Sequence, residues 1–391
     1  MLTSLALIFL LGLLAGSIFQ RLHLPALLGF LLAGILLGPH VWNLLDTTIL
    51  SISSDLRQLA LVIILTRAGL SLNIQDLKKA GRSALLLCFV PACLEIVGTL
   101  LLAPRLLQLS LTEAAVLGCV IAAVSPAVVV PRMLKLMEEG YGTKKSIPQM
   151  ILAGASVDDV LVIVLFTASC SLAGGGQLSP GTLLQVPASI LSGIALGALT
   201  GFAATLFFRR FHLRDTAKLL ILLSISFLFL ALEQRLKGYF PLSGFIAIIS
   251  LGICLNQNTP RLAKQLNFKY NQLWSAAEIL LFALVGAVVD PRHAWTAGLP
   301  ILLLILGALL FRMTGVLLCM LRTPLNYKER LFCMLAYTPK ATVQAALGAV
   351  PLSLGLACGQ QVLTAAAISI LLTAPLGAIC IDVLSQKFLT K

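Results

Sequence analysis

Long apolar runs recur along the whole chain, separated by short clusters of charged residues, glycine, proline or asparagine. At about 1.5 Å per helical residue, most of these runs are long enough to cross the hydrocarbon core of a bilayer. The pattern predicts an all-α polytopic membrane protein with thirteen transmembrane helices. The predicted helices cover residues 2–19, 24–38, 55–71, 83–104, 112–136, 146–172, 182–208, 216–233, 238–255, 270–289, 295–321, 327–354 and 360–384.

Composition excludes a soluble globular protein. Hydrophobic residues make up 59% of the chain, charged residues only 11%, and the mean hydropathy is +1.01, whereas a soluble domain carries about 25% charged residues. The nine cysteines show no metal-ligand spacing and mostly lie in apolar runs, so we expect neither a disulfide framework nor a zinc site. Residues 2–19 follow no positive segment, which favours a first transmembrane helix over a cleaved signal peptide.

The net charge of +13 is distributed unevenly across the predicted topology. Of the Lys and Arg residues in connections, 20 follow odd-numbered helices and 4 follow even-numbered helices. The positive-inside rule then places the amino terminus outside and the carboxyl terminus inside. The basic residues are thereby explained by membrane orientation, so we expect membrane lipids as partners and no nucleic acid.

A shift of 214 positions relates the two halves of the chain. CVIAAVSPAVVV from Cys119 then lies over CMLAYTPKATVQ from Cys333, and the first six helices begin close to the starts of the last six. Because the displacement is seven helices, an odd number, the halves are predicted to be inverted repeats, as in secondary transporters. The predicted first repeat covers 1–181, a linker helix 182–212 and the second repeat 213–391.

Prolines at the centres of both repeats predict interrupted helices. Pro126 and Pro339 lack an amide hydrogen and free the carbonyls of Ala122 and Leu335. Ordinary proline kinks are the alternative. Lys340 argues against them, because a buried ammonium costs at least about 2.5 kcal/mol and the negative end of a half-helix would compensate its charge. The residues predicted to form or compensate a crossed pair of broken helices are Pro126, Thr338, Pro339 and Lys340.

Two adjacent acids, Asp158 and Asp159, lie near the middle of the predicted helix 146–172. Neighbouring helical residues diverge, so one carboxylate can face a polar partner and the other the transport path. A structural ion pair or cap is the alternative, although charges buried in membranes are usually functional. Asp159 and Asp158, with Ser125, Ser156 and the freed carbonyls, offer the oxygen ligands of a hard cation. A desolvated carboxylate also binds protons, so cation and proton are predicted to compete.

Glu95 and Arg312 are isolated charges that the repeat shift places at related depths. Neither is expected to be buried alone, so we predict an ion pair between them, with a structural role or an Arg312 pair with Asp158 as alternatives. Arginine keeps its proton, so it would hold an acid ionised without carrying protons itself. For Glu278 and Arg67, a structural or cavity-lining role is favoured over a transport role.

Several segments resemble the NHA branch of the second monovalent cation/proton antiporter family. The segments are RAGLSLNIQDLKK at 67–79, VPACLEIVGTLL at 90–101, AVSPAVVVPRMLKLMEEGYGTKKSIPQMILAGASVDDVLVIVLF at 123–166, FRMTGVLL at 311–318 and YTPKATVQAALG at 337–348. The resemblance implies a homodimeric elevator transporter. Its core domain would comprise the fourth to sixth and eleventh to thirteenth predicted helices, and the remaining helices would form the dimerisation domain.

The resemblance also implies roles for single residues. Asp159 matches the cation- and proton-binding aspartate, Asp158 its neighbour, and Lys340 the lysine of the second broken helix. Glu95 matches the acid that pairs with Arg312, which stands where many bacterial relatives have lysine. This departure argues against electrogenic exchange of two protons, because arginine does not serve as a proton carrier.

The predicted function is exchange of Na⁺ or Li⁺ for protons by alternating access in the cell membrane, with K⁺ left open. No cofactor and no enzymatic activity are expected. The alternatives are a sodium-coupled symporter of a small organic anion, a cation channel, and an intramembrane aspartyl protease. A channel would typically have symmetry around a pore, and a protease would need its two acids on separate helices.

Overall fold

The computed structural model of the protein describes residues 1–72, 81–174, 180–211, 213–236, 239–292 and 298–391. Every regular element in these residues is helical. Among them, nine helical stretches are long and apolar enough to cross a membrane, and two of these, Gly81–Leu106 and Leu111–Glu139, each contain a break. Three shorter apolar helices, at Ala26–Leu37, Gly244–Asn258 and Thr342–Ser353, accompany them.

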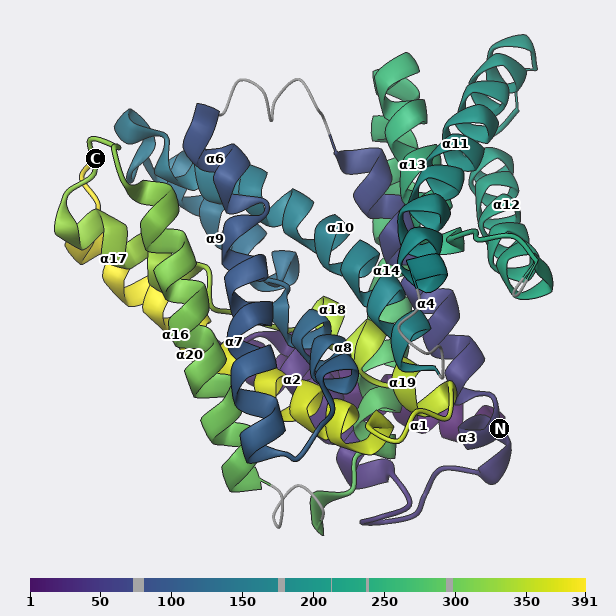
Figure 1. The fold of residues 1–391 in the computed structure, drawn as a ribbon, viewed down its shortest axis with the longest axis horizontal. Helices are drawn as coiled ribbons and strands as arrows, with labels where there is room; N and C mark the ends of the chain where they lie inside the picture. The colour runs from purple at the N-terminus through teal and green to yellow at the C-terminus, as the bar shows by residue number, and fades with distance from the viewer. Residues whose placement is uncertain (73–80, 175–179, 212, 237–238, 293–297) are drawn as a thin grey trace. The chain divides into compact units, whose positions relative to one another are not determined.

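The helices follow one another along the chain as Figure 1 shows. In the first half they are α1 (Leu2–Arg21), α2 (Ala26–Leu37), α3 (Thr47–Ser51), α4 (Ser53–Ser71), α6 (Gly81–Leu87), α7 (Val90–Leu106), α8 (Leu111–Ala122), α9 (Pro126–Glu139) and α10 (Ile147–Ala173). In the second half they are α11 (Pro180–Arg210), α12 (Asp215–Leu236), α13 (Gly244–Asn258), α14 (Pro260–Val288), α16 (Gly298–Met320), α17 (Tyr327–Ala336), α18 (Thr342–Gly348), α19 (Val350–Ser353) and α20 (Gly359–Phe388).

The helices group into two compact units. Unit 1 comprises Met1–Arg57, Asp76–Val162 and Ile279–Lys391, and unit 2 comprises Gln58–Gln75 and Ile163–Glu278. Unit 1 thus combines segments from both ends of the chain, which brings the two proline-containing regions into one body.

Within unit 1, α7 and α16 pack side by side through small residues (Figure 1). A Cβ atom on Gly98 would meet the Phe311 ring at 2.6 Å, and one on Gly315 would lie 2.8 Å from Pro91 Cα. Small residues of this kind let membrane helices approach closely where the hydrophobic effect gives no drive between them. The close contact places Glu95 of α7 against Arg312 of α16.

In unit 2, α11 and α13 pack closely against each other through glycines, as α7 and α16 do in unit 1 (Figure 1). A Cβ atom on Gly193 would lie 2.7 Å from the Ser243 carbonyl, and Gly197 packs on the Ala247 carbonyl. In the same unit, the Asn256 side chain donates to the Leu72 carbonyl at 3.0 Å. Unit 2 therefore has its own helix-helix core.

The predicted elements and the observed helices differ at breaks and at one helix start: the helix predicted over 270–289 begins at Pro260. The predicted helix 83–104 is interrupted between α6 and α7, 112–136 divides into α8 and α9, and 327–354 divides into α17, α18 and α19. The predicted helix starts at 238 and 295 lie outside the described residues. The count of thirteen, the inverted repeats, the linker helix and the orientation stay predictions.

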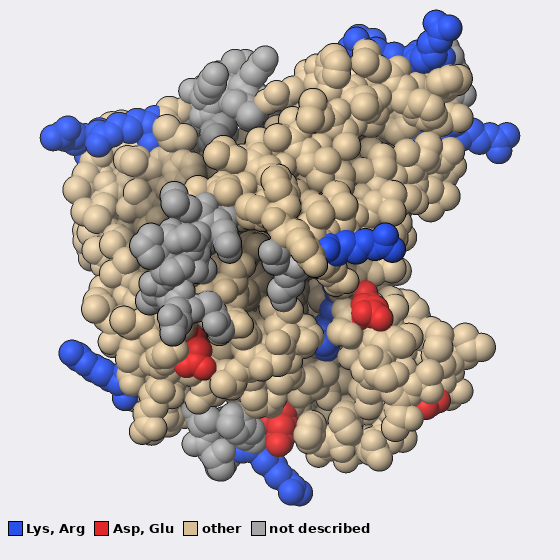
Figure 2. Space-filling model, turned by 45° about the vertical axis from the view of Figure 1, so that its right-hand side comes forward, with Lys and Arg blue, Asp and Glu red and all other residues tan. Residues whose placement is uncertain are grey.

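Charged side chains occupy little of the face shown in Figure 2, where most of the surface is neither basic nor acidic. Large hydrophobic side chains such as Leu10, Leu199 and Leu310 are more than 60% exposed. Apolar surface on this scale is expected where lipid tails rather than water surround the helices.

Gly34 of α2 tests the close packing within unit 1. A Cβ atom there would run into the main chain of Ala283 in α14, so Gly34→Ala is expected to lower the free energy of unfolding by about 1–3 kcal/mol through overpacking. Gly298→Ala is the matched control, because among the described residues no atom outside its own helix backbone and chain neighbours lies within 4 Å of the added Cβ. Thermal unfolding in detergent measures both, and equal melting temperatures would contradict the observed packing.

Candidate functional site

Two broken helices meet at the centre of unit 1. In the first, α8 ends at Ala122 and α9 begins at Pro126, whose missing N–H is tolerated in a first helical turn. In the second, α17 ends at Ala336 and α18 begins at Thr342. The Ser125 amide donates to the Pro339 carbonyl at 2.7 Å, so the two interruptions touch directly.

The carbonyl end of α8 receives two cationic side chains from the second half of the chain. Lys340 Nζ donates to the Ile121 carbonyl, and Arg312 Nη1 donates to the Ala122 carbonyl. The last carbonyls of a helix lack intrahelical partners and carry the negative end of its dipole. Both cations therefore lie where the main chain itself favours positive charge.

The Gln344 side chain of α18 binds the two carbonyls that flank those of Ile121 and Ala122. Its Nε2 donates to the Val120 carbonyl at 3.1 Å and to the Ala123 carbonyl at 3.0 Å. The Gln344 side chain is fully buried. The end of α8 is thus capped by side chains of α16 and of the second broken helix rather than by its own sequence.

Four charged side chains form a continuous network beside these carbonyls. Glu95 Oε1 lies 2.6 Å from Lys340 Nζ, and Glu95 Oε2 lies 2.9 Å from Arg312 Nη1. Arg312 Nη2 lies 2.9 Å from Asp158 Oδ2. All four side chains are 0% exposed, so their charges, two positive and two negative, compensate one another without solvent.

The main chain and the ring of Tyr337, in the second break, fix the orientation of the Arg312 guanidinium. Its Nε donates to the Tyr337 carbonyl at 2.6 Å, and its Cζ lies 5.1 Å from the centre of the Tyr337 ring. A planar guanidinium with donors on three nitrogens can bind two acids and two carbonyls at once, which lysine cannot. Arg312 consequently joins α7, α8, α10 and the second break.

The two aspartates on α10 have different surroundings. Asp158 Oδ2 accepts from Arg312 and from the Val124 amide at 2.8 Å. Asp159 is 8% exposed, forms no ion pair within the described residues, and leaves Oδ1 without a hydrogen-bond partner there. Asp158 is therefore neutralised by the protein, whereas the charge of Asp159 is not.

Further buried oxygens at the crossing have no hydrogen-bond partner among the described residues. They are Ser125 Oγ, Thr342 Oγ1, Gln344 Oε1 and Asp158 Oδ1. Ser125 is the N-cap of α9, yet its hydroxyl does not cap that helix. The side chain of Ser156 lies outside the described residues. Unpaired buried oxygens are costly unless a ligand or water uses them, so this set suits a hard cation.

No group of three or more His, Cys, Asp or Glu side chains able to hold a metal ion occurs in the part of the chain that the structure describes. The oxygens at the crossing come instead from one acid pair, hydroxyls and an amide. A low charge count of this kind fits a monovalent cation better than a divalent one.

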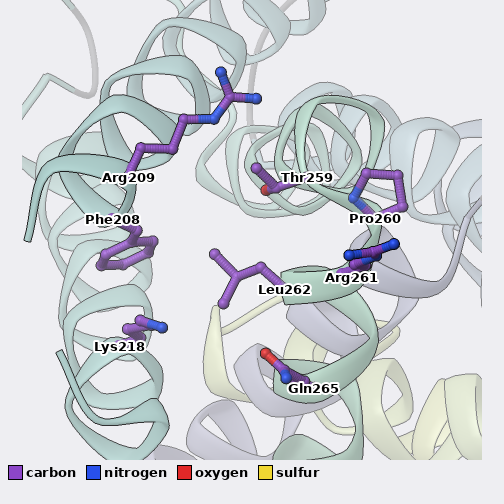
Figure 3. Close-up of a pocket in the computed structure, with 8 residues that line it drawn as sticks. All are labelled: Phe208, Arg209, Lys218, Thr259, Pro260, Arg261, Leu262 and Gln265. Carbon is purple, nitrogen blue, oxygen red and sulfur yellow. The ribbon is translucent and has the colours of Figure 1, made fainter. Parts of the chain in front are cut away.

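A groove in unit 2 offers no competing cation site (Figure 3). Its lining consists of Phe208, Arg209, Lys218, Thr259, Pro260, Arg261, Leu262 and Gln265. None of these eight residues is acidic, and three are basic. The groove would therefore repel a cation that the crossing in unit 1 would attract.

The structure corrects one detail of the sequence analysis. The Ala122 carbonyl is free for another side chain, as expected, but the Leu335 carbonyl is not. It accepts from the Thr338 amide at 3.2 Å and from the Thr338 hydroxyl at 2.8 Å. A threonine three residues on can bond to such a carbonyl locally, so Thr338 closes the end of α17 by itself.

Sequence reasoning missed three polar residues of the site. Tyr337, Gln344 and Thr373 all contact the breaks, and the Thr373 hydroxyl accepts from the Lys340 amide at 2.9 Å. A glutamine within an apolar run was a usable signal for Gln344. Tyrosine and threonine are common in membrane helices, so neither gave a comparable signal.

Comparison with known proteins now identifies the family. The sequence model described as sodium/hydrogen exchanger, transmembrane, matches residues 5–387. The chain belongs to the sodium/hydrogen exchanger family. The exchanger is accordingly a multi-pass membrane transporter rather than an enzyme, and membership in this family supports cation:proton exchange.

Individual relatives agree over most of the chain. Sodium/hydrogen exchanger 9B2 from Homo sapiens is 33% identical over 391 residues, covering 94% of this chain and 70% of that protein. Sodium/hydrogen exchanger 9B1 from Homo sapiens is 32% identical over 425 residues, covering 99% and 78%. The sodium proton antiporter MjNhaP1 from Methanocaldococcus jannaschii has the same fold, with a TM-score of 0.82 at 22% identity over 100% of this chain and 99% of that one.

Arg312→Met tests the buried network. The substitution removes the cationic partner of Asp158 and one of the two cationic partners of Glu95. Breaking a buried ion pair in this way is expected to lower the free energy of unfolding by about 3–5 kcal/mol. Arg132→Gln is the control, because its partner Asp382 is 44% exposed and such pairs contribute about 0–1 kcal/mol. Adding Glu95→Gln to Arg312→Met should recover part of the loss. Unfolding in detergent measures all three, and equal losses for Arg312→Met and Arg132→Gln would contradict the network.

Proposed function

We propose that this exchanger carries Na⁺ or Li⁺ in exchange for protons, and that Asp159 is the carboxylate at which they compete. The buried position of Asp159, with no cationic partner in the described residues, is the observation that supports this role most strongly. Assignment to the NHA branch is part of the same proposal and rests on the motif resemblance. K⁺ shares the charge and the oxygen preference of these cations, so the test below includes it.

Charge compensation gives a physical reason for coupling. The network of Glu95, Lys340, Arg312 and Asp158 is balanced without Asp159. An ionised Asp159 adds one uncompensated negative charge, and an unpaired charge in a low-dielectric interior costs several kcal/mol per ion. Either a proton or one monovalent cation removes that cost. We infer that the site changes its exposure readily only when one of the two is bound.

The ligand set follows from the unpaired oxygens at the crossing. Asp159 supplies a carboxylate, Asp158 supplies its remaining Oδ1, and Ser125 supplies a hydroxyl. Ser156, three residues before Asp159 on α10, completes the proposed set from the same helix face. Pro126 and Pro339 act by keeping the surrounding main chain open, and Thr338 by closing the end of α17.

A one-for-one stoichiometry is proposed from the same contacts. Lys340 Nζ is held by Glu95 and by the Ile121 carbonyl, so its loss of a proton would leave Glu95 with one cation fewer. Arg312 does not release its proton at any relevant pH. With both cations fixed, one proton at Asp159 exchanges for one cation, and no net charge crosses the membrane.

Movement and assembly complete the proposal. We propose an elevator movement in which the fourth to sixth and eleventh to thirteenth predicted helices form the moving core. The remaining helices would hold a homodimer together in the lipid of the cell membrane. Charge compensation at Asp159 requires neither the movement nor the dimer. If either of these proposals is wrong, the proposed role of Asp159 is unchanged.

Reconstitution into liposomes with an internal pH dye tests the proposed exchange. Na⁺ or Li⁺ added outside should drive proton efflux at a rate independent of a clamped membrane potential, and the same assay with K⁺ shows whether K⁺ is also exchanged. Asp159→Asn should reduce that efflux to the level of empty liposomes, because the amide cannot exchange a proton. Asp382→Asn, at an exposed acid, is the matched control and should leave it unchanged.

Efflux that survives in Asp159→Asn would contradict the assignment of Asp159. Uptake of Na⁺ that requires an organic anion and moves no proton would favour the alternative sodium-coupled symporter. A rate that changes steeply with the clamped potential would contradict the one-for-one stoichiometry while leaving exchange itself intact.

A further inference from the structure

A third interruption lies in the segment 81–106, which is separate in sequence from the breaks at Ala122–Pro126 and Ala336–Thr342. α6 ends at Leu87, and α7 begins at Val90 with Pro91 in its first turn. Proline has no N–H to donate four residues back, so Pro91 cannot serve the Leu87 carbonyl. That carbonyl is in a buried position and needs a partner from elsewhere.

Tyr337 is that partner. Its hydroxyl donates to the Leu87 carbonyl at 3.2 Å, across 250 positions of sequence. The preceding carbonyl, that of Leu86, is served locally by the Phe89 amide at 3.1 Å. The hydroxyl therefore supplies the Leu87 carbonyl with the hydrogen bond that Pro91 cannot donate.

The same tyrosine supports Arg312 from two directions. The Tyr337 carbonyl accepts from Arg312 Nε, and its ring lies under the guanidinium. Tyr337 is 0% exposed, and its hydroxyl also lies against Gly154, where no Cβ atom could fit beside it. Gly154 precedes Asp158 by one helical turn. Tyr337 thus contacts both Arg312 and α10, the helix that carries the Asp158 bound by Arg312.

We propose that Tyr337 is a positioning residue for cation–proton exchange. By holding the carbonyl that Pro91 leaves unserved, its hydroxyl fixes the ring and main chain against which Arg312 rests. Arg312 is thereby kept in the orientation in which Nη2 binds Asp158 and Nη1 binds Glu95. This inference rests on the proposed function, because it concerns the geometry of the proposed cation site.

A shift of Tyr337 would act on the site rather than only on stability. The three guanidinium nitrogens of Arg312 bind separate partners, with Nε on the Tyr337 carbonyl and Nη2 on Asp158. If the Tyr337 carbonyl moves and the guanidinium plane turns with it, the contact between Nη2 and Asp158 changes. Asp158 adjoins Asp159 in the chain and offers Oδ1 to the same cation. Loss of the hydroxyl should therefore weaken cation binding while the number of active molecules stays the same.

Tyr337→Phe tests the proposal, because it removes one oxygen and keeps the ring. In the liposome assay the apparent KM for Na⁺ should rise by about threefold to tenfold, the range expected for one hydrogen bond, with the maximal rate unchanged. The melting temperature should fall as well, because the buried Leu87 carbonyl loses its partner, so the KM is the measurement that separates a positioning role from a structural one. A purely structural role would lower the melting temperature or the maximal rate at constant KM, and that result would overturn the proposal.

Pro91→Ala provides a specific rescue. Alanine restores an N–H four residues after Leu87, so the Leu87 carbonyl no longer depends on the Tyr337 hydroxyl. In the Pro91→Ala background, Tyr337→Phe should change the KM for Na⁺ much less than it does in the unmodified chain. Equal effects of Tyr337→Phe in the two backgrounds would overturn the link between Tyr337 and Leu87.

Failure of this inference and failure of the proposed function give different results. If the unmodified chain shows no cation-driven proton efflux, the proposed function fails. If the unmodified chain exchanges and Tyr337→Phe has an unchanged KM, only the positioning role of Tyr337 fails.

Discussion

The carbonyl end of α8, which lacks intrahelical partners, is the feature on which the rest of the site depends. Four consecutive carbonyls, Val120 to Ala123, accept hydrogen bonds from side chains that all belong to the second half of the chain. Two of the three donor side chains are cations, which the negative end of a helix stabilises. These cations in turn determine where the buried acids can lie. A helix end left open by proline thus organises the charges of the whole crossing.

The resulting charge arrangement gives two adjacent acids different surroundings. Asp158 faces Arg312 and the Val124 amide, whereas Asp159 faces neither. Adjacent positions on one helix diverge, so a single turn can hold one acid in a fixed ion pair and offer the other to a mobile ion. An ionised Asp159 is costly in this interior unless something neutralises it. This cost would give the proposed exchange a thermodynamic basis without an additional carrier group.

The sequence predicted those parts of the site whose residue types are costly in a membrane. Prolines at 126 and 339, the acid pair and the buried cations stand out because each needs a special environment in lipid. Gln344 and Tyr337 were missed because their roles depend on carbonyls more than 200 positions away. The break before α7 could have been found, since Pro91 follows the same rule as Pro126. Local capping by Thr338 could not be separated from a free Leu335 carbonyl by proline spacing alone.

Proton release on cation binding tests the central claim most directly. Purified protein in weakly buffered detergent, held at a pH where Asp159 is protonated, should release close to one proton per chain when saturating Na⁺ is added, and an impermeant organic cation should release none. Removing the Asp159 carboxyl should abolish the release while the fold is retained. Release that persists without this carboxyl, or Na⁺ binding with no proton released, would contradict competition at Asp159.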